Sequence, residues 1–416
     1  MNARPHAIAC DVLIVGAGIA GAAAACALRN RGYSVVAVEA SGRPLDTARG
    51  DHLQAVVVDI LDRWGALPAF WAAGAEKRHA ARYLTDRGEP IIDINYFALP
   101  IPHPYYLYLH HELIAETFLK LAAENPKFMV LRPARAKDFE FESEGIRALT
   151  IRLSADGPAG LKEGDDVKIM PRMVIGADGR TSRVREALGF TADTYDYESP
   201  LVVQFAPRLA PDEDPLNYFT AFMGPNGSIS RIPRAFGNWK IGMTIAKQEI
   251  AFWKSATKQA RKAAVGRIAP QLEALDLELG GFYAVTLLNT HQWVKGNTVL
   301  LGDACHAMHP TRGQGMNVAI RCLDKLMAVL PEPADLARPD VVRASLAKYE
   351  RCVKPVIDKV LAENHALGAA RDSLDNDYVI KSIAGLRAIQ ADPERHRQYV
   401  LNSAGYGDGW DDDRRN

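Results

Sequence analysis

The sequence has few cysteines, no net charge and no long apolar run, and each absence excludes a class of protein. Its 5 cysteines among 416 residues form no CxxC pair and no metal-type spacing, so we expect neither a disulfide framework nor a bound metal. Fifty basic residues balance 50 acidic ones, which argues against a nucleic-acid partner or a polybasic membrane surface. The Ala-rich stretch 20–28 is too short to cross a bilayer. We therefore expect a soluble, cytoplasmic protein without obligatory membrane association.

A nucleotide-binding pattern lies near the N-terminus. Residues 11–15 form an apolar strand-like run, and Gly16, Gly18 and Gly21 follow with the spacing GxGxxG at the start of an Ala-rich helix. A second apolar strand then ends at Glu39, which lies 23 residues after Gly16. A strand, a glycine turn, a helix and a second strand with a terminal acid together predict a dinucleotide site.

Each of these residues has a chemical role in such a site. Gly16 permits the tight turn, Gly18 lets the pyrophosphate approach backbone N–H groups, and Gly21 lets the helix pack on its strand. Glu39 would accept hydrogen bonds from the adenosine ribose, and an acid there disfavours a 2′-phosphate, so FAD or NAD fits and NADP does not. The other contacts expected at this end of the cofactor are Ile19, Ala20 and Ala40.

Two more strand-and-loop patterns occur later in the chain. Asp178 follows the apolar strand 173–176, and Gly302 and Asp303 follow the apolar run 298–301. Asp303 therefore places a carboxylate at a strand end, and in a flavoprotein it could accept from the ribityl hydroxyls of an extended FAD.

A glycine-containing turn follows these patterns and opens a helix. In a flavoprotein it would place backbone N–H groups and a positive helix end beside the isoalloxazine, stabilising negative charge on the reduced ring. The contacts expected from this turn are Pro310, Gly313, Gly315, Met316 and Asn317.

Taken together, the glycine pattern with Glu39, the segment 176–179 and the segment 302–304 resemble the group A flavoprotein monooxygenases. These are single-component enzymes of the p-hydroxybenzoate hydroxylase fold, and they include ubiquinone-pathway hydroxylases. The three motifs occur in the family's order, and the resemblance covers roughly residues 10–375.

The resemblance implies an α/β fold in which a Rossmann-like FAD-binding domain carries an inserted, mainly antiparallel β-sheet substrate domain and C-terminal helices. We place the FAD-binding domain at 1–81, 109–194 and 288–340, the substrate domain at 82–108 and 195–287, and the C-terminal helices and tail at 341–416.

Three further residues follow from the resemblance. Asp178 would act near the pyrophosphate, with a helix N-cap as the alternative, and Arg49 matches the family's phosphate-binding arginine, with a surface ion pair as the alternative. The family often has Arg or Gln where this chain has His110 and His111, so His111 is the candidate there.

The implied activity is that of an FAD-dependent monooxygenase, which uses NADH or NADPH and O₂ to oxygenate a lipophilic aromatic, quinone-like or heteroaromatic molecule through a flavin C4a-hydroperoxide. Because the flavin does the chemistry, no motif encodes a catalytic side chain. The candidates for lining the substrate pocket are Tyr218, Phe222, Trp239 and Pro310.

Three alternatives remain open at this stage. A flavin-dependent halogenase lacks support because the sequence has no WxWxIP stretch. A reductase or desaturase of an isoprenoid or related substrate would share the FAD motifs but move hydride, and an FAD-binding protein without catalysis would share them too. The sequence leaves the substrate, the choice between NADH and NADPH, and the oligomeric state undetermined.

Overall fold

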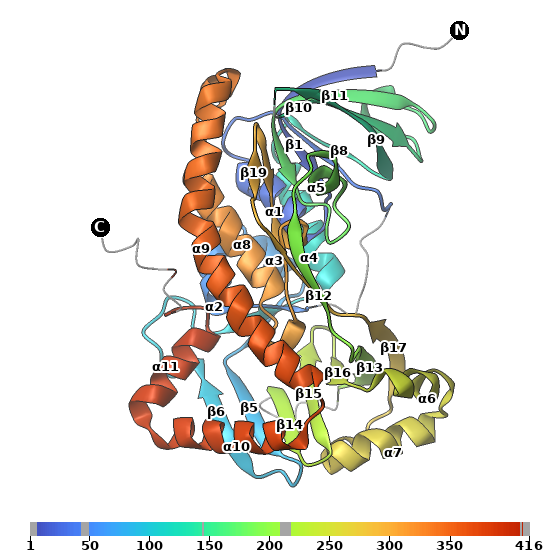
Figure 1. Ribbon diagram of the computed structural model, residues 1–416, viewed down its shortest axis with the longest axis vertical. Coiled ribbons are helices and arrows are strands. Elements are labelled where there is room, and N and C mark those ends of the chain that lie inside the picture. Colours follow the sequence, from blue (N-terminus) through green and yellow to red (C-terminus); the bar gives the residue numbers. More distant parts are fainter. Residues whose placement is uncertain (1–5, 43–49, 144, 209–217, 408–409, 411–416) are drawn as a thin grey trace.

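The computed structural model describes residues 6–42, 50–143, 145–208, 218–407 and 410, and its centre is a mostly parallel sheet (Figure 1). The strand order is β19-β20-β11-β1-β2-β8, and β10 and β9 extend the sheet from β11. The bounds are β1 His6–Val15, β2 Val35–Val38, β8 Phe128–Leu131, β9 Ala134–Glu142, β10 Gly145–Leu153, β11 Asp166–Gly176, β19 Val294–Lys295 and β20 Thr298–Leu300.

The central strands are parallel and end at one common edge. Val15 of β1 pairs with Gly176 of β11 and with Val38 of β2, and Gly176 pairs with Leu300 of β20. All four residues are buried, as the apolar runs in the sequence predict for parallel strands covered on both faces.

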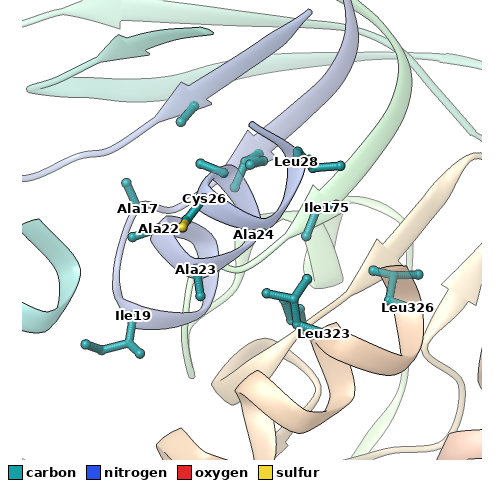
Figure 2. Packing of buried hydrophobic residues seen from close by; sticks show 14 of the residues in the cluster. Ala17, Ile19, Ala22, Ala23, Ala24, Cys26, Leu28, Ile175, Leu323 and Leu326 are labelled. Carbon is teal, nitrogen blue, oxygen red and sulfur yellow. The ribbon is translucent and has the colours of Figure 1, made fainter. Parts of the chain in front are cut away.

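Small side chains let the first helix lie very close to this sheet. In α1 (Ile19–Leu28) the four residues Ala22 to Ala25 are essentially inaccessible to solvent. Figure 2 shows this helix beside Ile175 of the sheet and beside Leu323 and Leu326 of α8 (Gly315–Met327). On another side, α1 packs against α4 (His111–Ala122).

A second sheet carries the inserted region. Its order is β17-β13-β16-β15-β14-β5-β6, and all its pairs are antiparallel except β5 with β14. Segments far apart in the chain therefore form one sheet. The bounds are β5 Ala80–Thr85, β6 Pro90–Asn95, β13 Leu201–Pro207, β14 Phe219–Gly224, β15 Gly227–Arg234, β16 Asn238–Thr244 and β17 Glu278–Tyr283.

The outer face of this second sheet packs on two short helices, α6 (Ile250–Ser255) and α7 (Lys258–Ile268), around a separate hydrophobic core. Shorter elements connect the two large sheets. They are β3 His52–Leu53, β4 Glu76–Arg78, β7 Tyr106–Tyr108, β12 Ala192–Asp196, β18 Thr286–Thr290, β21 His306–Ala307, α2 Ala55–Arg63, α3 Leu67–Ala72 and α5 Arg183–Ala187.

Three helices end the chain. The long α9 (Pro339–Asp372) runs along most of the molecule, and α10 (Asn376–Ala391) then crosses the second sheet at β6 and β14 (Figure 1). The helices expected at 341–416 continue beyond α10, since Asp392 caps α11 (Pro393–Ser403) by accepting from two backbone N–H groups. Within the described residues, no helix is both long and apolar enough to cross a membrane.

We expect the close approach of α1 to tolerate no added volume. Ala24→Leu should lower the free energy of unfolding by about 1–3 kcal/mol, because added methyl groups force displacement of the sheet or of α8. Chemical denaturation followed by circular dichroism measures this. Ala384→Leu, on the exposed face of α10, is the control and should change stability little. Equal stability of the two variants would contradict the close packing of α1.

Candidate active site

A cavity of about 1800 Å³ extends from the carboxyl edge of the parallel sheet to the inner face of the second sheet. The ends of β1 and β2 and the loop after β11 line one part of it, and strands β13 to β16 line the other. Helices α10 and α11 add further residues to the lining. A single space therefore joins the nucleotide motifs to the inserted region.

The three glycines of the first motif have different roles. Gly16 has a φ of +93°, and a Cβ there would lie 2.4 Å from the carbonyl oxygen of Ala177. A Cβ on Gly21 would lie 1.9 Å from the carbonyl oxygen of Gly16. A Cβ on Gly18, by contrast, would meet nothing within 4 Å. Gly16 and Gly21 are required by packing, whereas Gly18 leaves an open cradle at the helix start that fits a pyrophosphate.

Glu39 holds this loop in place. Its carboxylate accepts from the backbone N–H of Ala17 at 2.8 Å and from that of Ser41 at 2.8 Å. Each oxygen still has a lone pair for a ribose hydroxyl. Glu39 lines the cavity together with Ile19, Ala20 and Ala40, as a cofactor contact must.

Asp178 caps a helix, which was the alternative role considered for it. Its side chain accepts from the Ser182 hydroxyl, from Arg183 N–H at 2.7 Å and from Val184 N–H at 3.2 Å, at the start of α5. Asp178 lines the cavity, but its carboxylate oxygens are engaged in holding the loop.

Gly302 and Asp303 form a tight turn immediately after β20. Gly302 has a φ of +63°, and one oxygen of Asp303 accepts from Arg180 Nε at 3.2 Å. The other oxygen of Asp303 makes no hydrogen bond within the part of the chain that the structure describes. Arg180 thus links the second and third motifs and leaves Asp303 with a free acceptor at the cavity.

The turn before α8 brings backbone close to the cavity. Gly313 has a φ of +60°, and a Cβ there would lie 2.4 Å from the His52 ring. Pro310, Gly313, Gly315 and Met316 line the cavity.

Asn317 differs from the rest of this turn, because it is fully buried and does not line the cavity. It accepts from Gln54 N–H at 2.8 Å and donates to the carbonyl of Gly313 at 2.9 Å. Of the contacts expected from this turn, Asn317 is therefore the one that does not line the cavity, and its side chain holds the turn in position.

At the start of α4, His111 lines the cavity, and its Nδ1 lies 3.0 Å from the carbonyl oxygen of Gly50. Arg49 lies outside the described residues. The sequence analysis missed Arg132, which lines the same region and is held by Glu116 at 2.6 and 3.1 Å. The sequence feature that could have predicted Arg132 is the apolar run 128–131 just before it, because this strand ends at the same sheet edge as the motifs.

Two of the aromatic residues expected to line the substrate pocket point away from it. Phe222 and Trp239 are buried in the core beneath the second sheet. Side chains alternate between the two faces of a strand, so Phe219 and Met223 line the cavity while Phe222 does not.

The same alternation places Lys240 and Gly242 at the cavity and Trp239 behind it. Tyr218 is half-buried outside the cavity, with the Arg82 guanidinium 5.7 Å from its ring centre. Pro310 is the one member of this group that lines the cavity.

Other aromatic rings form the wall instead. Tyr106 is stacked on His52 at 5.4 Å and on Tyr96 at 4.9 Å, and Tyr83 and Tyr108 lie nearby. Burial raises the pKa of Tyr106 to about 12, so this hydroxyl stays protonated at neutral pH. The wall is therefore aromatic, and the hydroxyl of Tyr106 donates to the carbonyl oxygen of Ser403.

Three histidines of this region are neutral at pH 7. Burial is the main cause that lowers the pKa of His52, His306 and His309 to about 4. His309 accepts from Thr311 N–H through Nδ1 at 3.1 Å, so its proton lies on Nε2.

Comparison with known proteins gives consistent results. A family model described as "FAD binding domain" matches residues 9–364. The chain is 28% identical over 323 residues to 6-methylpretetramide 4-monooxygenase of Streptomyces rimosus, covering 75% of this chain and 72% of that protein. It is 25% identical over 377 residues to the ubiquinone hydroxylase UbiL of Rhodospirillum rubrum, covering 86% and 80%.

Solved structures show the same fold. PqsL, described as a probable FAD-dependent monooxygenase from Pseudomonas aeruginosa, superposes with a TM-score of 0.74 at 24% identity, covering 91% of this chain and 99% of that one. The p-nitrophenol 4-monooxygenase PnpA from Pseudomonas putida DLL-E4 superposes with a TM-score of 0.78 at 18% identity, covering 96% and 99%. These likenesses confirm the predicted fold class.

We expect Gly18→Ala and Gly21→Ala to separate cofactor binding from packing. Alanine at Gly18 fits its φ of −65° and meets open space, so stability without cofactor should be unchanged while FAD affinity falls roughly tenfold through crowding of the phosphates. Alanine at Gly21 gains about 1 kcal/mol of helix propensity, but the 1.9 Å clash outweighs it. Flavin fluorescence titration and thermal unfolding test this, and full FAD affinity in Gly18→Ala would contradict the cradle.

We expect stability to fall as pH drops from 6.5 towards 4. Because burial holds the folded-state pKa of His306 and His309 near 4, against 6.5 ordinarily, the unfolded chain binds more protons in that window. The loss is on the order of 3 kcal/mol per histidine by pH 4. Urea unfolding at several pH values measures it, and His309→Gln should reduce the slope. An unchanged slope in that variant would contradict the assignment for His309.

Proposed function

The chain belongs to the FAD-binding domain family and is a group A flavoprotein monooxygenase, and from that premise we propose that it uses NAD(P)H and O₂ to hydroxylate a lipophilic aromatic, quinone-like or heteroaromatic molecule. The observation that carries this proposal is the single cavity that runs from the open cradle at Gly18 to the aromatic wall at Tyr106. FAD is long enough to occupy the first part, and its ring would then face the second.

We assign the cofactor contacts from this geometry. Gly18 and Glu39 would hold the pyrophosphate and the adenosine, and the free oxygen of Asp303 would accept from the ribityl chain. The backbone at Gly313 and Gly315 would approach the ring system. When bound, FAD supplies the redox chemistry, since it takes electrons from NAD(P)H and activates O₂.

The chain's own residues then bind, orient and protect the reactants. The first turn of α8 at Gly315 presents unpaired N–H groups and a positive helix end, which stabilise negative charge near the ring. The wall formed by Tyr83, Tyr96 and Tyr106 can pack on an aromatic substrate and exclude water. Because Tyr106 stays protonated and donates its hydroxyl proton to the carbonyl oxygen of Ser403, it does not serve as a base, and its ring is what it offers to the substrate.

The size of the cavity supports a ring-containing substrate. About 1800 Å³ is larger than the usual 300–1,000 Å³ of a small-molecule pocket, so room for a substrate remains beside a cofactor. The relatives' names mention 6-methylpretetramide, ubiquinone and pentachlorophenol, which differ greatly in size. We infer an aromatic or quinone-like substrate from them and no particular compound.

The test is oxygen incorporation. We expect the FAD-loaded protein to oxidise NADH or NADPH faster in the presence of at least one compound from a panel of phenols, quinols and hydroxylated heteroaromatics. The product should contain one oxygen atom from isotopically labelled O₂, detected by mass spectrometry. A product reduced or desaturated without labelled oxygen would instead indicate a hydride-transferring enzyme, and no stimulation by any compound would indicate a protein without this catalysis.

A variant of the substrate wall provides the control. Gly242 lies on the cavity face of β16, and a Cβ there would meet nothing within 4 Å. Gly242→Val should therefore weaken stimulation by the active compound while leaving FAD content unchanged. If Gly242→Val lost FAD to the same extent as it lost stimulation, the result would contradict the assignment of this sheet face to the substrate.

A further inference from the structure

One wall of the cavity is a single helix, α10, which crosses the second sheet (Figure 1). Its cavity-lining residues recur three or four positions apart, on one face of the helix. They include Val379, Ser382, Leu386 and Ile389. The opposite face is exposed, and the Ile380 side chain on it is 56% accessible to solvent. Along this stretch α10 therefore separates the cavity from solvent.

The apolar packing of this helix is weak. Of its 16 residues, all of which the structure describes, only Val379 is buried. Val379 belongs to a small cluster with Ile91 of β6 and Met223 of β14. Helix α8, by comparison, buries nine of its 13 residues. Because the free energy of burial scales with the apolar area removed from water, moving α10 costs far less than moving α8.

Two polar contacts join α10 to the second sheet within the part of the chain that the structure describes. The backbone N–H of Asp93 in β6 donates to Gln390 Oε1 at 2.9 Å, and Arg387 pairs with Glu89 at 3.2 Å. We call these two contacts the tethers. Both are exposed to solvent, where such contacts contribute little to stability.

The chain on either side of α10 is held more firmly. At the end of α9, Asp372 accepts from the backbone N–H of Ser199 at 2.6 Å, and its carbonyl oxygen accepts from the Ser199 hydroxyl at 2.8 Å. At the end of α11, the carbonyl oxygen of Ser403 accepts from the Tyr106 hydroxyl and from Gln54 Nε2. A weakly packed helix between two fixed ends can move without unfolding its neighbours.

Both junctions of α10 have backbone that can change direction. Leu374, between α9 and α10, has a φ of +52°, which residues with a side chain rarely adopt. Leu374 also lines the cavity. Asp392 alone separates α10 from α11 and is extended, with a φ of −108°. A few residues at the ends of an element are enough to absorb the rotation of a rigid helix.

We propose that α10 is a lid over the substrate part of the cavity. It swings about the junctions at Leu374 and Asp392, opens to admit the substrate and release the product, and closes to keep water from the reacting groups. The inference rests on the proposed function, because a hydroxylation needs both exclusion of water and exchange of an organic substrate. Weak tethers suit this role, since the helix must detach in every turnover.

A thiol placed in the cavity reports the movement of the lid without any substrate. Gly242→Cys puts the thiol on the cavity face of β16, and Cys352→Ser removes an exposed cysteine, since the other four are buried. The FAD-loaded protein is treated with the thiol reagent dithionitrobenzoate, and the rate is followed by absorbance. We expect the cavity thiol to react at least about tenfold more slowly than Ala384→Cys on the exposed face of α10, because the reagent reaches it only when the lid opens.

Removing the tethers should open the lid more often. Arg387→Ala and Gln390→Ala should each speed the reaction of the cavity thiol about threefold, and together roughly tenfold, because each lost contact shifts the opening equilibrium by a small factor. Arg152→Ala is the control and should leave the rate unchanged. It removes an exposed ion pair with Asp166, and its strand, β10, does not line the cavity. Thermal unfolding verifies that the variants keep the fold.

Three results would overturn the proposal. The first is a cavity thiol that reacts as fast as the thiol at position 384, since the cavity would then be open without any movement. The second is an unchanged rate in the double tether variant. The third is an equal acceleration by Arg152→Ala. A failed proposed function gives a different result, because the labelling rates would still follow the tethers while no compound gave an oxygenated product.

Discussion

The whole site depends on three parallel strands that end in register. Because Val15, Gly176 and Leu300 are paired neighbours, the loops that follow them leave the sheet at one edge. Gly16, Asp178 and Asp303 are separated by more than a hundred residues in sequence, yet the hydrogen-bonding ladder brings them together. The carboxyl edge of a parallel sheet is where ligands bind in such folds, and here it carries all three motifs.

The packing around this edge of the sheet also fixes the backbone of the loops that follow the strands. Gly21 lets α1 approach the loop of Gly16, and the alanines of α1 let it lie beside α8, whose start forms the turn around Gly313. Asn317 then joins that turn to the backbone at Gln54. The loops of the candidate cofactor site are therefore braced by buried side chains, and a pre-positioned backbone needs little rearrangement to bind.

The sequence could predict the parts of the site that are local. A glycine turn between a strand and a helix, and an acid at the end of the next strand, are short-range patterns, so the dinucleotide motif followed from them, and the fold class followed from the resemblance of the three motifs together. The sequence could not show which side chains of the second sheet face the cavity. Phe219, Phe222 and Trp239 are all aromatic residues in strand-like segments, and only the strand register distinguishes the two faces. A role set by buried hydrogen bonds was missed as well, namely that of Asn317.

The two parts of the cavity are built from different kinds of segment, and this has a functional consequence. Backbone groups and small residues form the part assigned to the cofactor, where Gly16 and Gly313 are required by geometry. Side chains from the second sheet and from α9 to α11 form the part assigned to the substrate. Side chains such as Arg371 can change without disturbing the strand register. One fold can therefore keep its cofactor chemistry while the outer wall selects another aromatic substrate.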